Sequence, residues 1–289
     1  MVMDHLLEHD DANSSSLKSA SLVCRSFVAP CQCRIFATVR LRFSPDKPDR
    51  FTLRTFIPTN SKRGFKSSIE AFSRVTTDSP HLLGYVRHLD LHGSPYPLQP
   101  ALSSDHRDND CLNSQSHLLM TFLPNLAPTL RGFGMYRVNW NNLLPDLMIT
   151  IKSIFKSNLL TSLTLEWTTF LPIPVLTSCA HLQHFNLETI ELTPPDTWHD
   201  SAALARPVPN HQKQQLISLT LSTESLVIDW FATKHCIFDI SRLRHLVVFG
   251  AQRDFTKLFQ ICSSTLASLE MPGQSDPLIY SLHALFTLS

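Results

Sequence analysis

Two kinds of metal-binding residue gather near the N-terminus. Cys24, Cys31 and Cys33 follow His5 and His9, and thiolate and imidazole groups are the usual ligands of zinc. Zinc fingers and ribbons place paired ligands roughly two to four residues apart and add a second matching pair. The spacing here matches neither pattern, so the sequence favours small helix-packing cysteines and no metal site.

A second group resembles acid–base machinery. Asp196, His199 and Asp200 precede Ser201, within a stretch rich in proline. A catalytic base must be held by a rigid surrounding shell, and a segment of this composition offers little support. We therefore expect no catalytic residues and a protein that is not an enzyme.

Two further pairs give weak signals. Gly132 and Gly134 are closely spaced, but the third glycine of a dinucleotide-binding turn does not follow, so we expect no nucleotide or other cofactor. His181 and His184 flank Leu182 at the start of a predicted strand. Alternation places these two histidines on opposite sides, which favours exposed polar positions over shared metal ligation.

The elements that would position such residues form a repeat. An apolar residue, two others, an apolar residue, one other and a third apolar residue predict a short strand each time they recur. About half of the spacings fall within the roughly 20–29 residues of leucine-rich repeats, and the others require inserted loops. The recurrences are Val86/Leu89/Leu91, Leu130/Phe133/Met135, Leu160/Leu163/Leu165, Leu182/Phe185/Leu187, Leu216/Leu219/Leu221, Leu243/Leu246/Val248 and Leu266/Leu269/Met271, with Phe36/Val39/Leu41 before them.

Helical periodicity returns between these strands. The clearest apolar stripes run from Leu144 to Phe155 and from Phe255 to Cys262, and a further helix is expected from Phe65 to Val75. Alternating strands and helices predict an α/β fold with parallel strands on one side and helices on the other, as in a leucine-rich-repeat-like solenoid. The polar segments 93–116 and 193–215 are predicted to be inserted loops.

The first forty residues resemble a known family. Asp4–His9 reads DHLLEH, Ser16–Phe27 reads SLKSASLVCRSF, and Pro30–Phe36 reads PCQCRIF after a proline expected to interrupt the helix. These segments are similar to the F-box of fungal proteins in which that unit runs directly into irregular leucine-rich repeats. The resemblance implies an F-box-like helical segment over residues 1–36 and a repeat domain over residues 37–289.

The resemblance also implies a function. F-box helices bind the small Skp-family adaptor subunit of a cullin-type ubiquitin ligase, and the repeats present a surface to a substrate protein. The residues matched to adaptor binding are Leu6, Leu7, Leu17, Leu22, Val23 and Phe27. The alternative is a repeat scaffold with a vestigial F-box and no ligase role, since the family's Leu-Pro-x-Glu opening is absent and Asp10 stands where an apolar residue is common.

The bulk properties fit a protein-binding module. The 289 residues are 43% apolar with a formal charge of +1, which gives no indication of nucleic acid or membrane as a partner. Basic residues gather between Arg40 and Lys66, a bias typical of a solvated loop, with an electrostatic docking patch as the alternative. Seven cysteines without framework spacing, no secretory signal and no long apolar run predict an intracellular protein, cytoplasmic or nuclear.

Tryptophans mark candidate contacts, because this residue is enriched among binding hot spots. Trp167, just past a strand, and Trp230, in a predicted helix, are expected to be packing residues. Trp198 lies in the predicted loop 193–215, where exposure is expected, and it is our candidate substrate contact.

Overall fold

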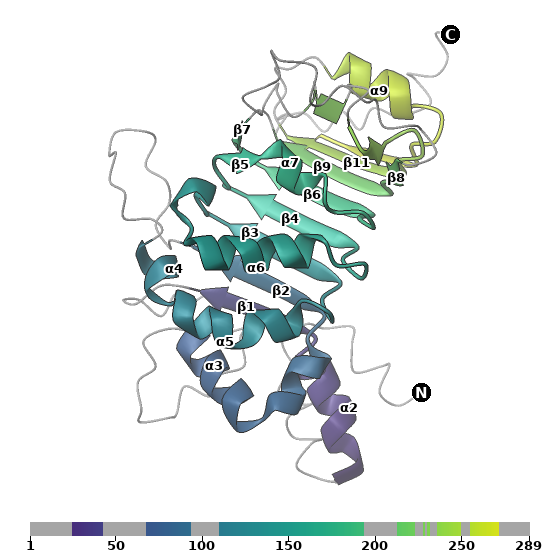
Figure 1. Cartoon of the computed structure of the whole chain (residues 1–289). Helices are drawn as coiled ribbons and strands as arrows, with labels where there is room; N and C mark the ends of the chain where they lie inside the picture. The colour runs from purple at the N-terminus through teal and green to yellow at the C-terminus, as the bar shows by residue number, and fades with distance from the viewer. Residues whose placement is uncertain are drawn as a thin grey trace. The chain divides into compact units, whose positions relative to one another are not determined.

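The computed structural model of the chain, drawn in Figure 1, describes residues 25–42, 68–93, 110–193, 213–222, 228, 230–231, 236–249 and 255–271. The chain divides into two compact units. Unit 1 comprises Met1–Phe133 and Leu143–Ile154, and unit 2 comprises Gly134–Asn142 and Phe155–Ser289. The predicted boundary between an F-box-like segment and a repeat domain at residue 36 stays a prediction.

The protein is α/β, as the sequence predicts, with eight strands in the order β1-β2-β3-β4-β6-β9-β11-β12 in its larger sheet. These strands are β1 (Thr38–Arg42), β2 (His88–His92), β3 (Gly132–Tyr136), β4 (Ser162–Glu166), β6 (His184–Glu188), β9 (Ser218–Ser222), β11 (His245–Phe249) and β12 (Ser268–Glu270). Two short parallel pairs join β5 (Leu171–Pro172) to β7 (Leu192–Thr193) and β8 (Gln214–Gln215) to β10 (Phe238–Asp239).

Helices occupy most of the described chain between these strands. The α-helices are α2 (Arg25–Ile35), α3 (Ser68–Asp78), α4 (Asp110–Ser114), α5 (Ser116–Leu126), α6 (Pro145–Phe155), α7 (Ile173–Leu176) and α9 (Thr256–Cys262). The described residues also include two 3-10 helices, η2 (Pro80–Tyr85) and η4 (Trp140–Asn142).

The recurring apolar triplets place the strands. In every triplet but the last the second and third apolar residues are the second and fourth residues of a strand, and the first lies two residues before the strand begins; β12 ends at Glu270, one residue before Met271. Leu163 and Leu165 of β4 and Leu219 and Leu221 of β9 are fully buried. Because successive strand residues point to opposite faces, the first, third and fifth residues of each strand share the other face.

The register between neighbouring strands is constant. In unit 2, Ser162 lies opposite His184, His184 opposite Ser218, Ser218 opposite His245, and His245 opposite Ser268. A recurring hydrogen-bond pattern fixes this register, since a carbonyl just before one strand accepts two amide protons at the start of the next. The carbonyl of Gln183 accepts from Ile217 and Ser218, that of Ile217 from Arg244 and His245, and that of Arg244 from Ala267 and Ser268.

Each unit has its own aromatic packing. In unit 1, Phe72 of α3 meets Phe122 of α5 edge to face, with ring centroids 5.0 Å apart. In unit 2, Phe238 lies 5.4 Å from Phe185 and 5.7 Å from Trp230, which is buried as predicted. Aromatic pairs at such distances contribute specific packing beyond the area that they bury.

Two predictions about local structure are wrong. Pro30 does not interrupt the N-terminal helix but lies inside α2, because an internal proline removes a single backbone donor and the remaining bonds carry the helix on to Ile35. The end of the predicted loop 93–116 is helical, since α4 covers Asp110–Ser114 and α5 begins at Ser116. Leu112 of α4 is buried, so packing decides this segment against its polar composition.

Candidate interaction surfaces

The residues matched to adaptor binding lie at the start of the chain. Leu6, Leu7, Leu17, Leu22 and Val23 are outside the described residues, and Phe27 lies on α2. The Phe27 side chain is 44% exposed, although it is large and apolar. It is therefore available for contact with another protein, and α2 leads into β1 within three residues.

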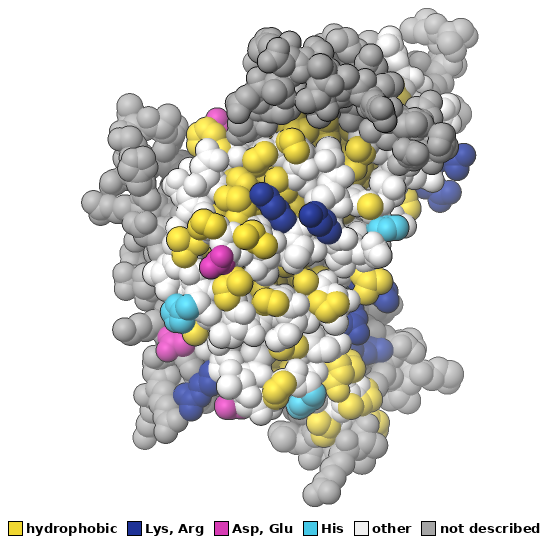
Figure 2. All heavy atoms as spheres, viewed as in Figure 1, with side chains coloured by type: hydrophobic (Ala, Val, Ile, Leu, Met, Phe, Trp, Pro, Cys, Tyr) yellow, Lys and Arg dark blue, Asp and Glu magenta, His cyan; other side chains and the backbone are white. Residues whose placement is uncertain are grey.

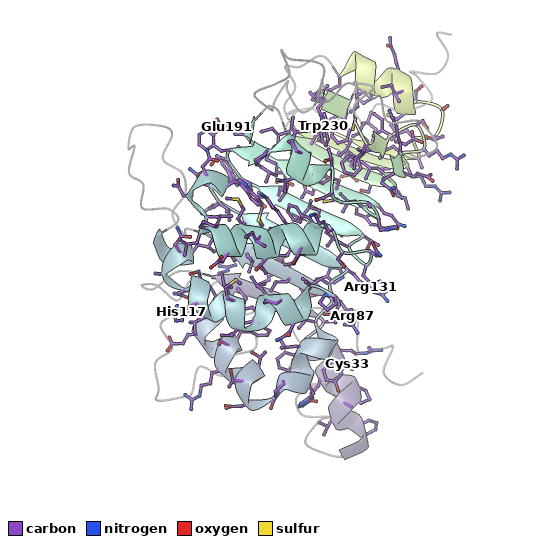
Figure 3. All side chains as sticks on the ribbon, viewed as in Figure 1. Cys33, Arg87, His117, Arg131, Glu191 and Trp230 are labelled. Carbon is purple, nitrogen blue, oxygen red and sulfur yellow. The ribbon has the colours of Figure 1, made fainter. Side chains whose placement is uncertain are left out.

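The described cysteines do not form a metal site. Cys31 is buried in α2, as expected of a packing residue, whereas Cys33 is exposed, so the packing interpretation is wrong for that residue. Figure 3 labels Cys33 on α2. The cysteines of the described chain, Cys31, Cys33, Cys179, Cys236 and Cys262, are all free thiols. Within the described ranges no three His, Cys, Asp or Glu side chains gather where they could hold a metal ion.

Five residues considered for catalysis or substrate contact lie outside the described chain. They are Asp196, Trp198, His199, Asp200 and Ser201. His181 and His184 are both exposed, as predicted. His184 is the first residue of β6 and faces outward between Ser162 and Ser218.

The larger candidate surface is the outward face of unit 2, formed by alternate residues of β4, β6, β9, β11 and β12. Its side chains are half-buried or exposed, in contrast to the buried leucines between them. Read across the strands, its rows are Ser162–His184–Ser218–His245–Ser268, Thr164–Asn186–Thr220–Val247–Glu270 and Glu166–Glu188–Ser222–Phe249. This face presents serine and histidine side chains in its first row and carboxylates and an aromatic ring in its last.

The turns after β3, β4 and β6 share a left-handed backbone conformation at their first residue. Arg137, Trp167 and Thr189 each follow the last residue of a strand and each has a positive φ, of 57°, 54° and 47°. The Arg137 amide donates to the Glu166 carbonyl, and the Trp167 amide donates to the Glu188 carbonyl, each at about the normal distance (2.8 Å and 2.9 Å). The left-handed conformation is disfavoured for bulky residues, so these turns are set by the hydrogen bonds of the repeat and not by local preference.

The exposure of Trp167 argues against packing as its main role. Its side chain is 37% exposed, as is that of Phe170 three residues later. Phe170 also has a positive φ, of 57°. The left-handed turn directs Trp167 out of the core, and the neighbouring Thr168 is fully buried in its place, with its hydroxyl 3.4 Å from the Met135 carbonyl.

Carboxylates lie beside these aromatic side chains. Glu166 and Glu188 are register partners on β4 and β6. Burial raises the pKa of Glu166 above its ordinary value, and the negative charge of Glu188 raises it further. Arg137 and a side-chain hydrogen bond with Trp167 lower it and offset part of the rise. Glu188 is held in turn by the Asn186 amide, whose Nδ2 donates to Oε1 at 3.1 Å.

In unit 1 the outward face carries an ion pair and a close contact. Arg40 Nε on β1 donates to Asp90 Oδ2 on β2 at 3.2 Å. Burial raises the pKa of Asp90, and the charge and the hydrogen bond of Arg40 lower it and offset part of the rise. A β-carbon at Gly132 of β3 would lie 2.1 Å from His88 Nδ1, so the imidazole occupies the space that a larger residue would need.

The strand starts of unit 1 bear two arginines. Figure 3 labels Arg87 and Arg131 next to one another at this edge, and the Arg131 amide donates to the Arg87 carbonyl at 2.7 Å. The Arg87 guanidinium turns back onto its own chain, where Nη1 donates to the carbonyl oxygen of Gly84 at 2.8 Å. Arg87 therefore caps the end of η2.

Apolar side chains also reach the surface on the helical side. Figure 2 shows them interspersed with polar atoms over α5 and α6. On and just before α6, Ile149 is 64% exposed and Leu144 is 42% exposed. Single apolar residues of this kind are normal on protein surfaces and do not by themselves mark a site.

Comparison of the sequence with models of protein families and with curated proteins finds no match. None of the described helices is both long and apolar enough to cross a membrane. The residues that sequence reasoning missed are Phe170, Glu166 and Glu188, whereas Trp167 was a candidate contact. The signal available for them was position, because each follows or ends a predicted strand, where side chains leave the core.

Proposed function

We propose that the chain is a non-enzymatic adaptor of a cullin-type ubiquitin ligase. In this proposal the N-terminal F-box-like helices bind a Skp-family subunit, and the repeats bind a substrate protein. The observation that carries it is the constant register of the strands of unit 2, which sets out one side of these repeats as rows of half-buried or exposed side chains. Surfaces of this type bind proteins in many repeat families.

The repeats are taken to be leucine-rich-repeat-like. Three regularities support this assignment: the spacing of the buried apolar triplets, the parallel strand that each triplet forms, and the left-handed residue after β3, β4 and β6. A repeat of one strand and one connection cannot cover its own apolar face, so neighbouring repeats must stack. The half-buried Leu266, Leu269 and Met271 belong to the last described repeat.

The ligase role is supported by the F-box-like motif and by the exposure of Phe27. A large apolar side chain on a helix surface is the kind of group that enters a groove of a partner protein. Phe27 lies at the end of the SLVCRSF segment, which is the most specific part of the resemblance. The motif thus ends with an apolar ring that faces solvent in the unbound chain.

The test is binding of the full chain to a purified Skp-family subunit, measured by calorimetry. The L22D/V23D double variant is expected to lose binding, and Phe27→Ala is expected to weaken it by about tenfold or more, as for a hot-spot aromatic. Phe170→Ala is the matched control, because Phe170 is also an exposed phenylalanine but lies in unit 2. Absence of binding by the unaltered chain would contradict the ligase role and leave a repeat scaffold with a vestigial F-box.

A further inference from the structure

A small surface at the ends of β4 and β6 combines exposed aromatic rings with carboxylates. We call it the aromatic–acidic edge, and it consists of Glu166, Trp167, Phe170, Glu188 and Glu191. Trp167 and Phe170 are each 37% exposed. Figure 3 shows Glu191 beside β5 and β7, past the ends of β4 and β6. All five residues belong to unit 2.

The rings of this edge are held on a fixed backbone. The turn from Trp167 to Leu171 is tied to the next repeat at both ends: the Trp167 amide donates to the Glu188 carbonyl at 2.9 Å, and the Leu171 amide donates to the Glu191 carbonyl at 3.2 Å. Between them the Glu191 amide donates to the Thr168 carbonyl at 3.0 Å. Because the turn is fixed before any partner arrives, little backbone freedom is lost when the rings are covered.

The two aromatic residues keep an unfavourable backbone conformation. Their φ values, 54° at Trp167 and 57° at Phe170, lie in the left-handed region that large side chains avoid. Glycine would fit the same turn without strain. The presence of tryptophan and phenylalanine at these two positions, with their side chains directed away from the core, is therefore not explained by the folding of the turn.

The carboxylates are also placed at a cost to the free protein. Glu166 and Glu188 are register partners on adjacent strands, and like charges directly opposite one another are destabilising. The Asn186 amide holds Glu188 at 3.1 Å, and Arg137 is the cation near Glu166. With Glu191, the edge keeps more negative than positive charge, and a bound cation would relieve the repulsion between the two strands.

We propose that the aromatic–acidic edge is the site at which the chain binds its substrate protein, through an extended segment that carries Lys or Arg beside apolar residues. The inference rests on the proposed adaptor function and names the chemistry of its partner. Lysine and arginine bind both to carboxylates and to the faces of tryptophan and phenylalanine rings. A nucleic acid or an anionic membrane would be repelled by the same carboxylates.

The probe is a short fluorescein-labelled peptide alternating Arg and Leu, titrated with the full chain and followed by fluorescence anisotropy. Peptides with Gln or Glu in place of Arg are compared with it. We expect binding of the Arg peptide that weakens as salt is added, at least about tenfold weaker binding of the Gln peptide, and none of the Glu peptide. Equal binding of the Arg and Gln peptides would overturn the proposal.

The variants separate contact from folding. Trp167→Gly suits the positive φ, so the turn is expected to keep its conformation, and the affinity for the Arg peptide is expected to fall by about tenfold or more. Glu188→Gln removes the like-charge contact and is expected to raise the melting temperature while lowering that affinity by about fivefold. Unchanged affinity in Trp167→Gly would overturn the proposal.

Controls distinguish this inference from the adaptor role. Glu270→Gln removes a carboxylate from β12 of the same unit, and Phe27→Ala removes a ring from α2; both are expected to bind the Arg peptide as the unaltered chain does. Binding of the Skp-family subunit without binding of the peptide would refute the edge and leave the adaptor role. Binding of the peptide alone would support the edge and refute the ligase role.

Discussion

The imidazole of His88 lies where a β-carbon of Gly132 would be, with Nδ1 2.1 Å from that position. The two residues belong to β2 and β3 of unit 1, on the outward side of the strands. The glycine therefore makes room for a neighbouring side chain. This role needs neither a positive φ nor a ligand.

We expect Gly132→Ala to destabilise the fold by about 1–3 kcal/mol, the usual effect of overpacking. The double variant H88A/G132A should recover most of the loss, because the atoms that clash are removed. Urea unfolding followed by circular dichroism measures both effects. Gly84→Ala is the control, since nothing lies within 4 Å of a β-carbon at Gly84. A Gly132→Ala protein as stable as the unaltered chain would show that His88 moves aside freely.

The buried triplets predict that adjacent residues of one strand contribute very differently to the free energy of unfolding. Leu219 of β9 is fully buried, and Thr220 beside it faces outward and is half-buried. Leu219→Ala should cost about 2–5 kcal/mol through lost burial and the cavity left behind. Thr220→Ala should change the free energy of unfolding by about 0.5 kcal/mol or less. Similar losses at both positions would contradict the assigned faces of the strand.

The strands were predictable because their signal is local and repeated. A buried parallel strand needs apolar residues at alternate positions, and Leu163/Leu165, Phe185/Leu187 and Leu246/Val248 supply them in the sequence itself. The α/β class follows from the helical stripes between them, such as Leu147, Ile151 and Ile154 of α6.

The candidate site was less predictable because its signals are not local. The exposure of Trp167 depends on a left-handed turn that is fixed by the carbonyl of Glu188 in the following repeat. The proximity of Glu166 and Glu188 depends on strand register, and the glycine at 132 is explained only by a side chain 44 residues earlier, His88. The members of each pair belong to different repeats, so no short stretch of sequence contains both.

Cysteine reactivity should separate the described thiols. Burial raises the pKa of Cys179 to about 12 and that of Cys236 to about 12, whereas Cys33 is exposed on α2. Because the thiolate is the reactive form, Cys179 and Cys236 should resist alkylation by iodoacetamide at neutral pH, and Cys33 should react first. Peptide mass spectrometry at increasing reaction times measures the order. In urea all three should react at similar rates, and early alkylation of Cys236 in the folded chain would contradict its burial.

Glu166 should make the stability of the fold depend on pH. Burial and the charge of Glu188 raise its pKa in the folded state above the ordinary value of 4.5, although Arg137 and the hydrogen bond with Trp167 oppose the rise. At pH values between 4.5 and the higher pKa of the folded state, Glu166 therefore binds more protons in the folded state than in the unfolded state. The contribution of this group to the free energy of unfolding is thus fully present below 4.5 and falls as the pH rises through that window.

Replacing Glu166 by Gln removes the titrating group, so the variant should gain stability over the unaltered chain as the pH rises from 4.5 to 7 and should match it more closely at low pH. Urea unfolding at a series of pH values measures the difference between the two curves. Glu270→Gln, at an exposed position of β12, should follow the unaltered chain throughout. Parallel curves for Glu166→Gln and the unaltered chain would mean that burial and the charge of Glu188 do not raise the pKa of Glu166 above its ordinary value. The aromatic–acidic edge would then hold no net electrostatic cost at Glu166 that a basic partner could relieve.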